Sequence, residues 1–539
     1  SDEFTGIPFN LTVMNRRNFI SGMFPTLMAP SVINGFSVRP VSPSPYLDAL
    51  LGYATETDHV LVVIQMNGGN DGLNMVIPRN NYSAYFNART NIAIPESKIL
   101  ALNGKAETGL HPSMTGMQSL YNDGKLSIVQ AVGYPNPNFS HFRATDIWMS
   151  ATDSNVVATS GWGGRYLSEE YPNYPTGYPN SAMPDPLAIQ IGSVTSLMLQ
   201  GPAFNMGMSI TNPTSFYNLV NGIQDPAPPG NAGKELTYIR TVAQQTQQYA
   251  TVIKDAAAKV VVQNPYPTGN TLGDQLKIVA RLIKGGLKTR VYMCSIGGFD
   301  THSLQVVASD TTTGTHANLM KQLSDAVKAF MDDLKFLQIE DRVMGMTFSE
   351  FGRRIKSNSS VGTDHGAAAP LFVFGSKVSP GVLGVNPTIP TNVTVNDNIP
   401  YQYDFRSVYG TLLQNWFCAG TTTVQTVLFR NFQSLPLVQS AACTTGLDDL
   451  NQTAGETLIV SYPNPFHAST KISFKTTGGH VLIQVLDNQG RLIANLVDKE
   501  YLQGKYDIQF NGETLIPGVY YLRFQNGPLQ QVKSMLKVR

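Results

Sequence analysis

Five apolar runs of strand length, spread between about residues 55 and 440, constrain the fold more than any other feature of the chain. They cover residues 59–66, 126–132, 290–296, 342–348 and 370–374. None alternates apolar with polar residues, which is typical of strands buried on both faces. Helical periodicity separates them, most clearly over 316–337, where Leu323, Val327 and Phe330 fall on one stripe. Strands that alternate with helices predict an α/β fold with a mostly parallel sheet flanked by helices.

Polar clusters stand next to nearly all of these runs. GGNDGLN follows the first run, NFSHFR follows the second, GGFDTH the third and SEFGRR the fourth, while TDHG comes just before the fifth. In open α/β sheets, ligands bind outside the carboxyl ends of the strands. We therefore expect these polar side chains to form one shared site at that edge of the sheet.

The carboxylate and imidazole groups of these clusters predict a metal centre. Asp300 and His302 lie two residues apart, so they point the same way in extended backbone, and His365 adds a ligand from another loop. This set suits Zn²⁺ with an open coordination position, with Ca²⁺, Mn²⁺ or Mg²⁺ as alternatives. Asp71 and Glu350 could hold a second ion, and two ions can clamp the attacking and leaving oxygens of an ester. Asp71, in Asn-Asp-Gly, equally suits a simple turn.

Ser140 is the candidate nucleophile. It stands just before a predicted helix, HFRATDIWMSA, where free backbone N–H groups favour an anionic substrate and a metal could activate the hydroxyl. Arg143, Arg353 and Arg354 could bind phosphate or sulfate oxygens bidentately. Ser140 could instead be only an N-cap. His141 is interpreted as a structural neighbour of Ser140 rather than as a metal ligand.

The character of the chain changes at residue 456. Short alternating runs, from TLIVSY to QVKSMLKV, are separated by turn sequences such as DNQG, NG and PG. Short strands at even spacing predict a small all-β sandwich over 456–539. The organisation we predict is a leader with an export signal over 1–54, an α/β domain over 55–442, a polar linker over 443–455, and the sandwich.

Composition is that of an extracellular protein rich in loops. Charged residues make up 14% of the chain, and a net charge of +1 without a basic stripe argues against a nucleic-acid partner. Arg16 and Arg17 precede a modest apolar stretch, as in a twin-arginine signal, although an ordinary basic signal region fits as well. Prolines break that stretch, and we expect no transmembrane span. Cys418 and Cys443 could pair in an oxidising compartment.

Two known families share these motifs. In order, GGNDGLN, SHF, GGFDTH, SEFGRR and DHG resemble the domain-of-unknown-function family 1501, a branch of the alkaline-phosphatase-like superfamily. YPNPF, VLDNQGRLI, LIPGVYYLRF and a basic end resemble the type A sorting domain of the type IX secretion system. The second resemblance implies the secretion machinery as a partner. It also implies export through the periplasm to the cell surface or the medium.

The superfamily pattern implies roles for the site residues. Asp71 and the nucleophile Ser140 would share one metal, while Asp300 and His302 would hold the other, and His365 would be the final histidine of the pattern. The chain departs from the pattern at the residue after Glu350, where a metal-binding histidine is expected.

Phe351 occupies that position. Because phenylalanine cannot bind a metal, the second ion site is weakened or lost, and one ion with an arginine in place of the other is an alternative. The leading hypothesis is a secreted metal-dependent hydrolase of small or polymeric phosphate or sulfate esters. A non-catalytic surface or binding protein on a retained hydrolase fold is the second. A metal-free serine esterase is the third, but no Gly-x-Ser-x-Gly sequence is present.

Overall fold

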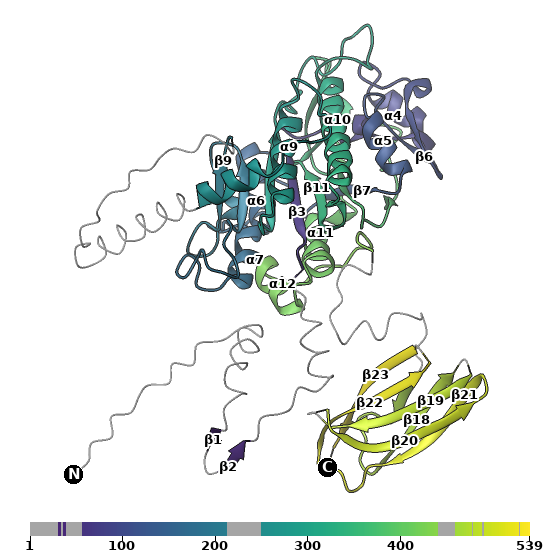
Figure 1. The fold of residues 1–539 in the computed structure, drawn as a ribbon. Coiled ribbons are helices and arrows are strands. Elements are labelled where there is room, and N and C mark those ends of the chain that lie inside the picture. Colours follow the sequence, from purple (N-terminus) through teal and green to yellow (C-terminus); the bar gives the residue numbers. More distant parts are fainter. Residues whose placement is uncertain are drawn as a thin grey trace, which may run out of the picture. The chain divides into compact units, whose positions relative to one another are not determined.

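The computed structural model describes residues 31–33, 36–38, 57–212, 249–439, 459–476, 478–487, 490–527 and 529–538. These residues fall into two compact units, one within Thr57–Cys443 and one drawn from Ser1–Glu56 and Thr444–Arg539 (Figure 1). Two short antiparallel strands, β1 (Ser31–Ile33) and β2 (Phe36–Val38), precede the first unit in sequence. The rest of the predicted leader, with its twin arginine, and the predicted linker over 443–455 lie outside the described residues.

The larger unit contains a nine-stranded sheet. Along the sheet, the strands run in the order β15 (Gly381–Leu383), β7 (Leu126–Gly133), β14 (Ala369–Gly375), β11 (Val343–Phe348), β3 (Val60–Met66), β10 (Val291–Ile296), β8 (Ala188–Ile191) and β9 (Gly207–Ile210), with β16 (Tyr403–Asp404) also paired to β7. Among the described strand pairs of this sheet, only the two made by β14 are antiparallel. The predicted mostly parallel sheet is confirmed, and each of the five apolar runs forms one of its strands.

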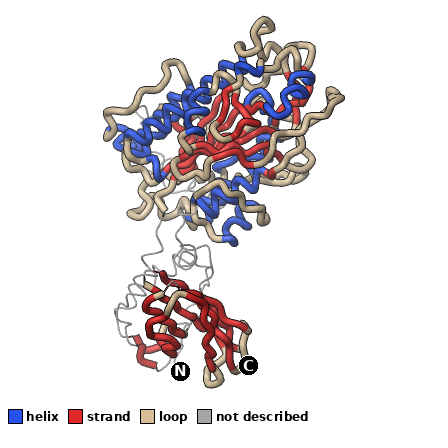
Figure 2. The backbone as a smooth tube through the Cα atoms, turned by 90° about the vertical axis from the view of Figure 1, so that its right-hand side faces the viewer, coloured by secondary structure: helices blue, strands red, loops and turns tan. Residues whose placement is uncertain are grey.

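Helices cover both faces of this sheet (Figure 2). One face packs against α5 (Thr115–Asn122), α9 (Thr271–Lys284) and α10 (Thr315–Phe336), and the other packs against α6 (His141–Ser150), α7 (Trp162–Glu170), α11 (Phe405–Thr411) and α12 (Thr421–Leu428). Successive residues of β3 serve opposite faces, since Val62 joins the first core and Val63 the second. Both faces are therefore apolar, which explains why the strand sequences do not alternate.

The carboxyl ends of β3, β10 and β11 lie side by side at one edge of the sheet. Met66 is in register with Ile296, and Gln65 with Phe348, so the loops that follow these strands start next to one another. Strand β14 runs in the opposite direction, so the hairpin of β12 (Gly352–Ser357) and β13 (Thr363–Gly366) that precedes it meets the same edge. The polar clusters of the sequence therefore converge there.

Smaller elements extend the same unit. After β3 come α3 (Gly72–Met75), β4 (Val76–Pro78) and α4 (Tyr82–Ala88), and β4 pairs with β6 (Lys105–Leu110), which pairs with β5 (Leu100–Leu102).

Within the described part of the chain, no helix is both long enough and apolar enough to cross a membrane. Cys294 is a buried free thiol. Cys418 is disulfide-bonded, whereas Cys443, its expected partner, lies outside the described residues.

Among its described residues, the C-terminal unit contains strands and the loops that join them but no helix. One sheet has the order β17 (Ile459–Tyr462), β18 (Ser469–Thr476) and β21 (Gly504–Asn511), and the other has the order β20 (Leu492–Tyr501), β19 (Gly479–Leu486), β22 (Gly518–Asn526) and β23 (Leu529–Lys537). All strand pairs within these sheets are antiparallel. Phe474 of the first sheet shares a core with Ile483 and Phe524 of the second. The predicted all-β sandwich is confirmed.

Candidate metal centre

Glycines allow three loops of the sheet edge to pack directly on one another. Gly68, with φ +123°, lies so close to the loop after β10 that a β-carbon on it would be 2.3 Å from the backbone nitrogen of Asp300. A β-carbon on Gly362, in the β12–β13 hairpin, would be 2.4 Å from the carbonyl carbon of His302. Only glycine permits such approaches. The loop after β3, the loop after β10 and the hairpin are therefore held in contact around Asp300 and His302.

Arg353, on β12, ties the same loops together. Its side chain is fully buried, and it bonds Oδ1 of Asp300 at 2.8 Å. Its guanidinium also donates to the backbone carbonyls of Gly68, Gly69, Phe299 and Thr363. A buried guanidinium with all three nitrogens engaged is not available to a substrate, so the predicted substrate contact of Arg353 finds no support. Its geometry is that of a residue that positions Asp300.

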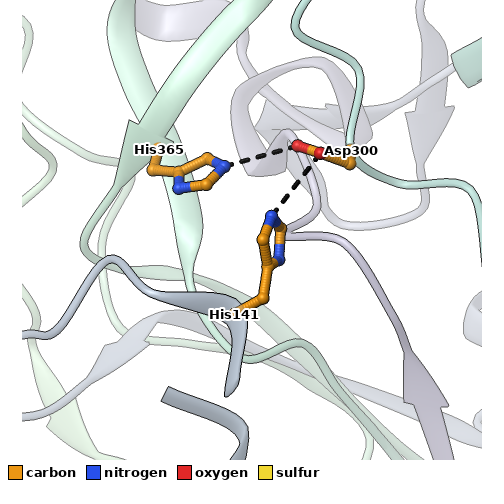
Figure 3. A group of neighbouring side chains, drawn as sticks. All are labelled: His141, Asp300 and His365. Atoms are coloured by element: carbon orange, nitrogen blue, oxygen red, sulfur yellow. Dashed lines mark hydrogen bonds and ion pairs between the residues drawn. The ribbon is translucent and has the colours of Figure 1, made fainter. Parts of the chain in front are cut away.

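Three histidine rings meet at the carboxylate of Asp300. Oδ1 lies 3.2 Å from Nε2 of His302 and 3.3 Å from Nε2 of His365, and Oδ2 lies 3.5 Å from Nε2 of His141. Figure 3 shows His141 and His365 approaching Asp300 from different segments. Donor atoms of His141, Asp300 and His365 all lie within 4.8 Å of one another. Ligands of a tetrahedral ion with bonds of about 2.0–2.1 Å are roughly 3.3 Å apart, close to the 3.3 Å from His365 and the 3.5 Å from His141 to the carboxylate of Asp300.

The other nitrogen of each ring contacts an oxygen that only accepts hydrogen bonds. The three Nδ1 contacts are 2.7 Å from His365 to the carbonyl of Phe139, 2.9 Å from His141 to Oε1 of Glu350, and 3.2 Å from His302 to Oδ1 of Asp364. Each Nδ1 therefore carries a hydrogen, and in the neutral form of a ring the lone pair is at Nε2. Histidine ligands of metals are oriented in this way by carbonyl and carboxylate groups.

In the neutral forms of His302 and His365, the two Nε2 lone pairs face one another. Nε2 of His302 and Nε2 of His365 are 2.8 Å apart, and both adjoin the carboxylate of Asp300. With both rings neutral, these two lone pairs and the carboxylate, which also accepts from Arg353, form a set of electron-pair donors that favours a cation. The chemistry of this donor set therefore fits a divalent ion.

The ionisation states agree with this assignment. Partial burial raises the pKa of Asp300, but the hydrogen bond and charge of Arg353 and the adjacent histidines lower it by more, so its net pKa is lowered. Burial lowers the pKa of His365 and outweighs its bond to the carbonyl of Phe139. An ionised carboxylate and a neutral imidazole are the forms that bind metals.

Glu350 and Phe351 contact the imidazole rings of the cluster and hold them in place. Oε1 of Glu350 accepts from the backbone N–H of Gly68 at 2.8 Å and contacts His141, so the structure places Glu350 beside the cluster as an orienting group. The buried ring of Phe351 lies 4.4 Å from that of His365 and 5.0 Å from that of His141, centroid to centroid. Phe351 thus holds the two imidazoles by packing.

Asp71 is not among the residues that the structure brings together. Its carboxylate is buried, and both oxygens lie 2.8 Å from one guanidinium nitrogen of Arg89, with a further bond from Gln305 at 2.6 Å. Burial raises the pKa of Asp71, but the charges of Arg89 and His316 and the hydrogen bonds from Arg89 and Gln305 together lower it by more, so the net pKa is lowered. The carboxylate of Asp71 therefore forms a buried structural ion pair with Arg89. The predicted second ion site at Asp71 and Glu350 has no counterpart in the described cluster.

Ser140 occupies the N-cap position of α6 and is exposed, but its side chain makes no capping hydrogen bond. The guanidinium of Arg143 donates to the backbone carbonyls of Ser154 and Val156 instead of contacting the cluster. His141, expected to be structural, is brought into the cluster, so that expectation needs correction. The signal for this role is the position of His141 in the sequence. It is the first residue of the helix after β7, and this helix begins at the same edge of the sheet.

Two family models match parts of the chain. Residues 234–406 match the model of a family described as a protein of unknown function, DUF1501. Residues 460–538 match the model of the secretion system C-terminal sorting domain. No curated protein matches the chain. The sorting domain implies export by the type IX secretion machinery, with the cell surface or the medium as the destination.

Several solved structures are similar to parts or most of the chain. The PsFucS1 sulfatase from Pseudoalteromonas sp. is 10% identical over 88% of this chain and 89% of that chain, with a TM-score of 0.31. An alkaline phosphatase superfamily protein from Vibrio parahaemolyticus is 11% identical over 79% of this chain and 76% of that chain, with a TM-score of 0.30.

PorZ, a surface component of the type-IX secretion system of Porphyromonas gingivalis, is 16% identical over 19% of this chain, with a TM-score of 0.13. The match spans only 14% of PorZ. The expected resemblances to both families are confirmed: this chain carries a DUF1501 region over residues 234–406 and a secretion system C-terminal sorting domain over residues 460–538.

Proposed function

We propose that the chain is a secreted, metal-dependent hydrolase of phosphate or sulfate esters. One divalent ion, with Zn²⁺ as the first choice, would be held by Asp300 and His365 together with the adjoining His141 and His302. The observation that carries this proposal is the 2.8 Å approach of the two Nε2 atoms of His302 and His365, whose Nδ1 atoms face acceptors. A bound divalent ion would polarise an ester oxygen and lower the pKa of a coordinated water.

The residues of the chain would supply charge, orientation and access. Asp300 contributes the only carboxylate that contacts all three described rings, and about half of its side chain is exposed, so a substrate can reach it. Ser140 remains the candidate nucleophile because it is exposed, directly precedes His141 and begins a helix of 10 residues. Backbone N–H groups at a helix start favour negative charge that develops on an ester.

Export supports a substrate outside the cell. We propose that the chain crosses the periplasm and acts at the surface or in the medium, on small or polymeric esters that carry negative charge. The C-terminal sorting domain supports the destination.

A second function, metal-dependent binding without hydrolysis, is favoured by two residues. Arg353, the predicted contact to the substrate anion, is buried and bonded within the protein. Phe351 stands where the superfamily has a metal ligand, and it packs on the rings. Such a protein would bind the ion and the anionic group but would not turn over the ester.

The test is turnover of aryl and alkyl phosphate and sulfate esters by the full chain with Zn²⁺, with and without chelator. We expect Asp300→Asn to lower kcat/KM at least about 100-fold, because it removes the charge of the shared ligand. Asp498→Asn, which alters an exposed aspartate of the C-terminal unit, is the matched control and should be unchanged. Full activity in Asp300→Asn or with chelator refutes the metal mechanism. Metal binding without turnover of any ester favours the second function.

A further inference from the structure

A buried glutamine side chain bonds to three segments of the chain that meet at the metal centre. Gln305, in the loop after β10, is fully buried, and its amide nitrogen donates to Oδ2 of Asp71 at 2.6 Å. Its amide oxygen accepts from the hydroxyl of Thr301 at 3.1 Å and from the hydroxyl of Thr363 at 2.9 Å. One amide therefore connects the loop after β3, the loop after β10 and the β12–β13 hairpin.

The two threonines lie next to the imidazoles in the chain. Thr301 directly precedes His302, and Thr363 comes two residues before His365. Both threonines are buried, whereas the ring of His302 is nearly half exposed. The backbone N–H of Thr363 also donates to the carbonyl of Thr301 at 3.2 Å. We propose that Gln305 is a positioning residue, which sets the spacing of His302 and His365 from the buried side. The inference rests on the proposed function, in which these two imidazoles are metal ligands.

The neighbours of this amide allow it one orientation. Asp71 is ionised in its pair with Arg89, so its oxygens only accept hydrogen bonds. The nitrogen of the Gln305 amide must therefore face Asp71, because the reversed amide would bring two acceptors together. The amide oxygen is then left for the two threonine hydroxyls, which donate to it. Gln305 is thus a link of defined length and direction between the three segments.

The far end of this link is itself anchored. One guanidinium nitrogen of Arg89 lies 2.8 Å from both oxygens of Asp71, and the other two donate to the carbonyl of Ile355 on β12, at 3.1 and 2.8 Å. Asp71, Arg89 and Gln305 are each no more than 1% exposed. A buried polar network whose members are bonded in this way specifies a single arrangement. The buried carboxylate of Asp71 therefore has a role at the centre although it does not touch the cluster.

The test removes the link without changing the net charge. Gln305→Met deletes the amide at similar size, Thr363→Val deletes one of its two donors, and Thr363→Ser keeps that hydroxyl. We expect Gln305→Met to lower the Zn²⁺ affinity of the full chain about 10-fold, as does the loss of groups that orient metal ligands. Thr363→Val should lose part of that affinity, and Thr363→Ser should bind as wild type. The visible absorption bands of the Co²⁺-loaded chain depend on ligand geometry, so they should change in Gln305→Met and Thr363→Val alone.

Gln484→Met is the matched control, because Gln484 is a buried glutamine of the C-terminal unit whose amide also bonds at both ends. It should become less stable toward urea without any change in Zn²⁺ affinity or in the Co²⁺ spectrum. Crystal structures of the metal-free chain add a readout that needs no ion. The Nε2 atoms of His302 and His365, 2.8 Å apart in the wild type, should lie farther apart in Gln305→Met.

Two results overturn the inference. One is a folded Gln305→Met chain with wild-type affinity, spectrum and imidazole spacing. The other is equal affinity and equal spectra in Thr363→Val and Thr363→Ser, whether or not Gln305→Met folds. A wild-type chain that binds neither Zn²⁺ nor Co²⁺, but whose imidazoles separate in Gln305→Met, refutes the proposed function and leaves the inference standing.

Discussion

At the scale of single residues, the centre depends on hydrogen bonds that its ligands make away from the ion. Phe139, Glu350 and Asp364 each hold the Nδ1 side of one imidazole and so decide which nitrogen faces Asp300. Only Glu350 had been singled out from the sequence, as a ligand. A backbone carbonyl such as that of Phe139 leaves no trace in the residue type, so this orienting role could not be predicted.

Two other histidines, His111 and His316, are buried in the interior of the same unit. His111 and His316 are fully buried with their rings edge to face, 5.8 Å apart, and His316 contacts Oδ1 of Asn70 at 3.1 Å. Burial is the main cause that lowers the pKa of His111 to about 3 and that of His316 to about 4. Both rings are therefore neutral in the folded state at pH 5.

Their burial predicts a loss of stability in mild acid. Between pH 6.5 and about 4 the unfolded chain binds more protons than the folded chain, so the free energy of unfolding falls as the pH falls. Each fully effective histidine contributes up to about 1.4 kcal/mol per pH unit in this window. Urea unfolding at pH 7 and pH 5 should show a smaller pH difference for His316→Gln, whose amide can still donate to Asn70. His480→Gln, an exposed control, should behave as wild type. The same pH difference in His316→Gln as in wild type would count against this account.

At the scale of elements, the site is an edge where parallel strands end and one hairpin returns. Strands β3, β10 and β11 could be predicted because strands buried on both faces must be apolar throughout. The hairpin of β12 and β13 was expected as loops, because GRRIKS and TDHG are polar and their pairing depends on backbone bonds. Asp71 was expected at the centre because the sequence does not reveal that Arg89, 18 residues later, folds back to neutralise it.

The close packing of the β12–β13 hairpin on the loop after β10 leads to a prediction for Gly362. A β-carbon there would lie 2.4 Å from the backbone of His302, so Gly362→Ala should push the hairpin away and separate His302 from His365. We expect Zn²⁺ affinity, measured by competition with a chromogenic chelator, to fall about 10- to 100-fold, as when groups that orient ligands are lost. Gly297→Ala is the control from the loop after β10, since a β-carbon there meets nothing within 4 Å. Equal affinity in the two variants would show that this contact does not shape the site.

At the scale of the whole molecule, the residues of the proposed metal centre and the residues that match the sorting domain lie in different units of the chain. Every side chain of the centre comes from the unit within Thr57–Cys443, and the core of the C-terminal sandwich contains residues of that sandwich alone among those described. The resemblance to a sorting domain was visible in the sequence because turn residues and short motifs recur in fixed order. The division at 443–455 stays a prediction.

This division predicts that the two roles separate on truncation. A chain ending at residue 442 should bind Zn²⁺ with unchanged affinity, because no described ligand lies beyond that point. Expressed in a cell that has the type IX machinery, it should fail to reach the surface or the medium, whereas the full chain should reach them. Fractionation with immunoblotting and metal competition are the two measurements. A folded truncated chain that has lost its metal affinity would mean that the sandwich takes part in the centre.

The central claim is the ion itself, and anomalous X-ray scattering from crystals of the full chain loaded with Zn²⁺ tests it most directly. The account predicts a peak about 2.0–2.2 Å from an oxygen of Asp300 and from Nε2 of His365, with Nε2 of His141 or His302 as a further ligand. Asp300→Asn crystals should show the peak much weakened. A well-ordered wild-type crystal in which His302 and His365 keep their contact while no anomalous peak lies beside Asp300 would contradict it.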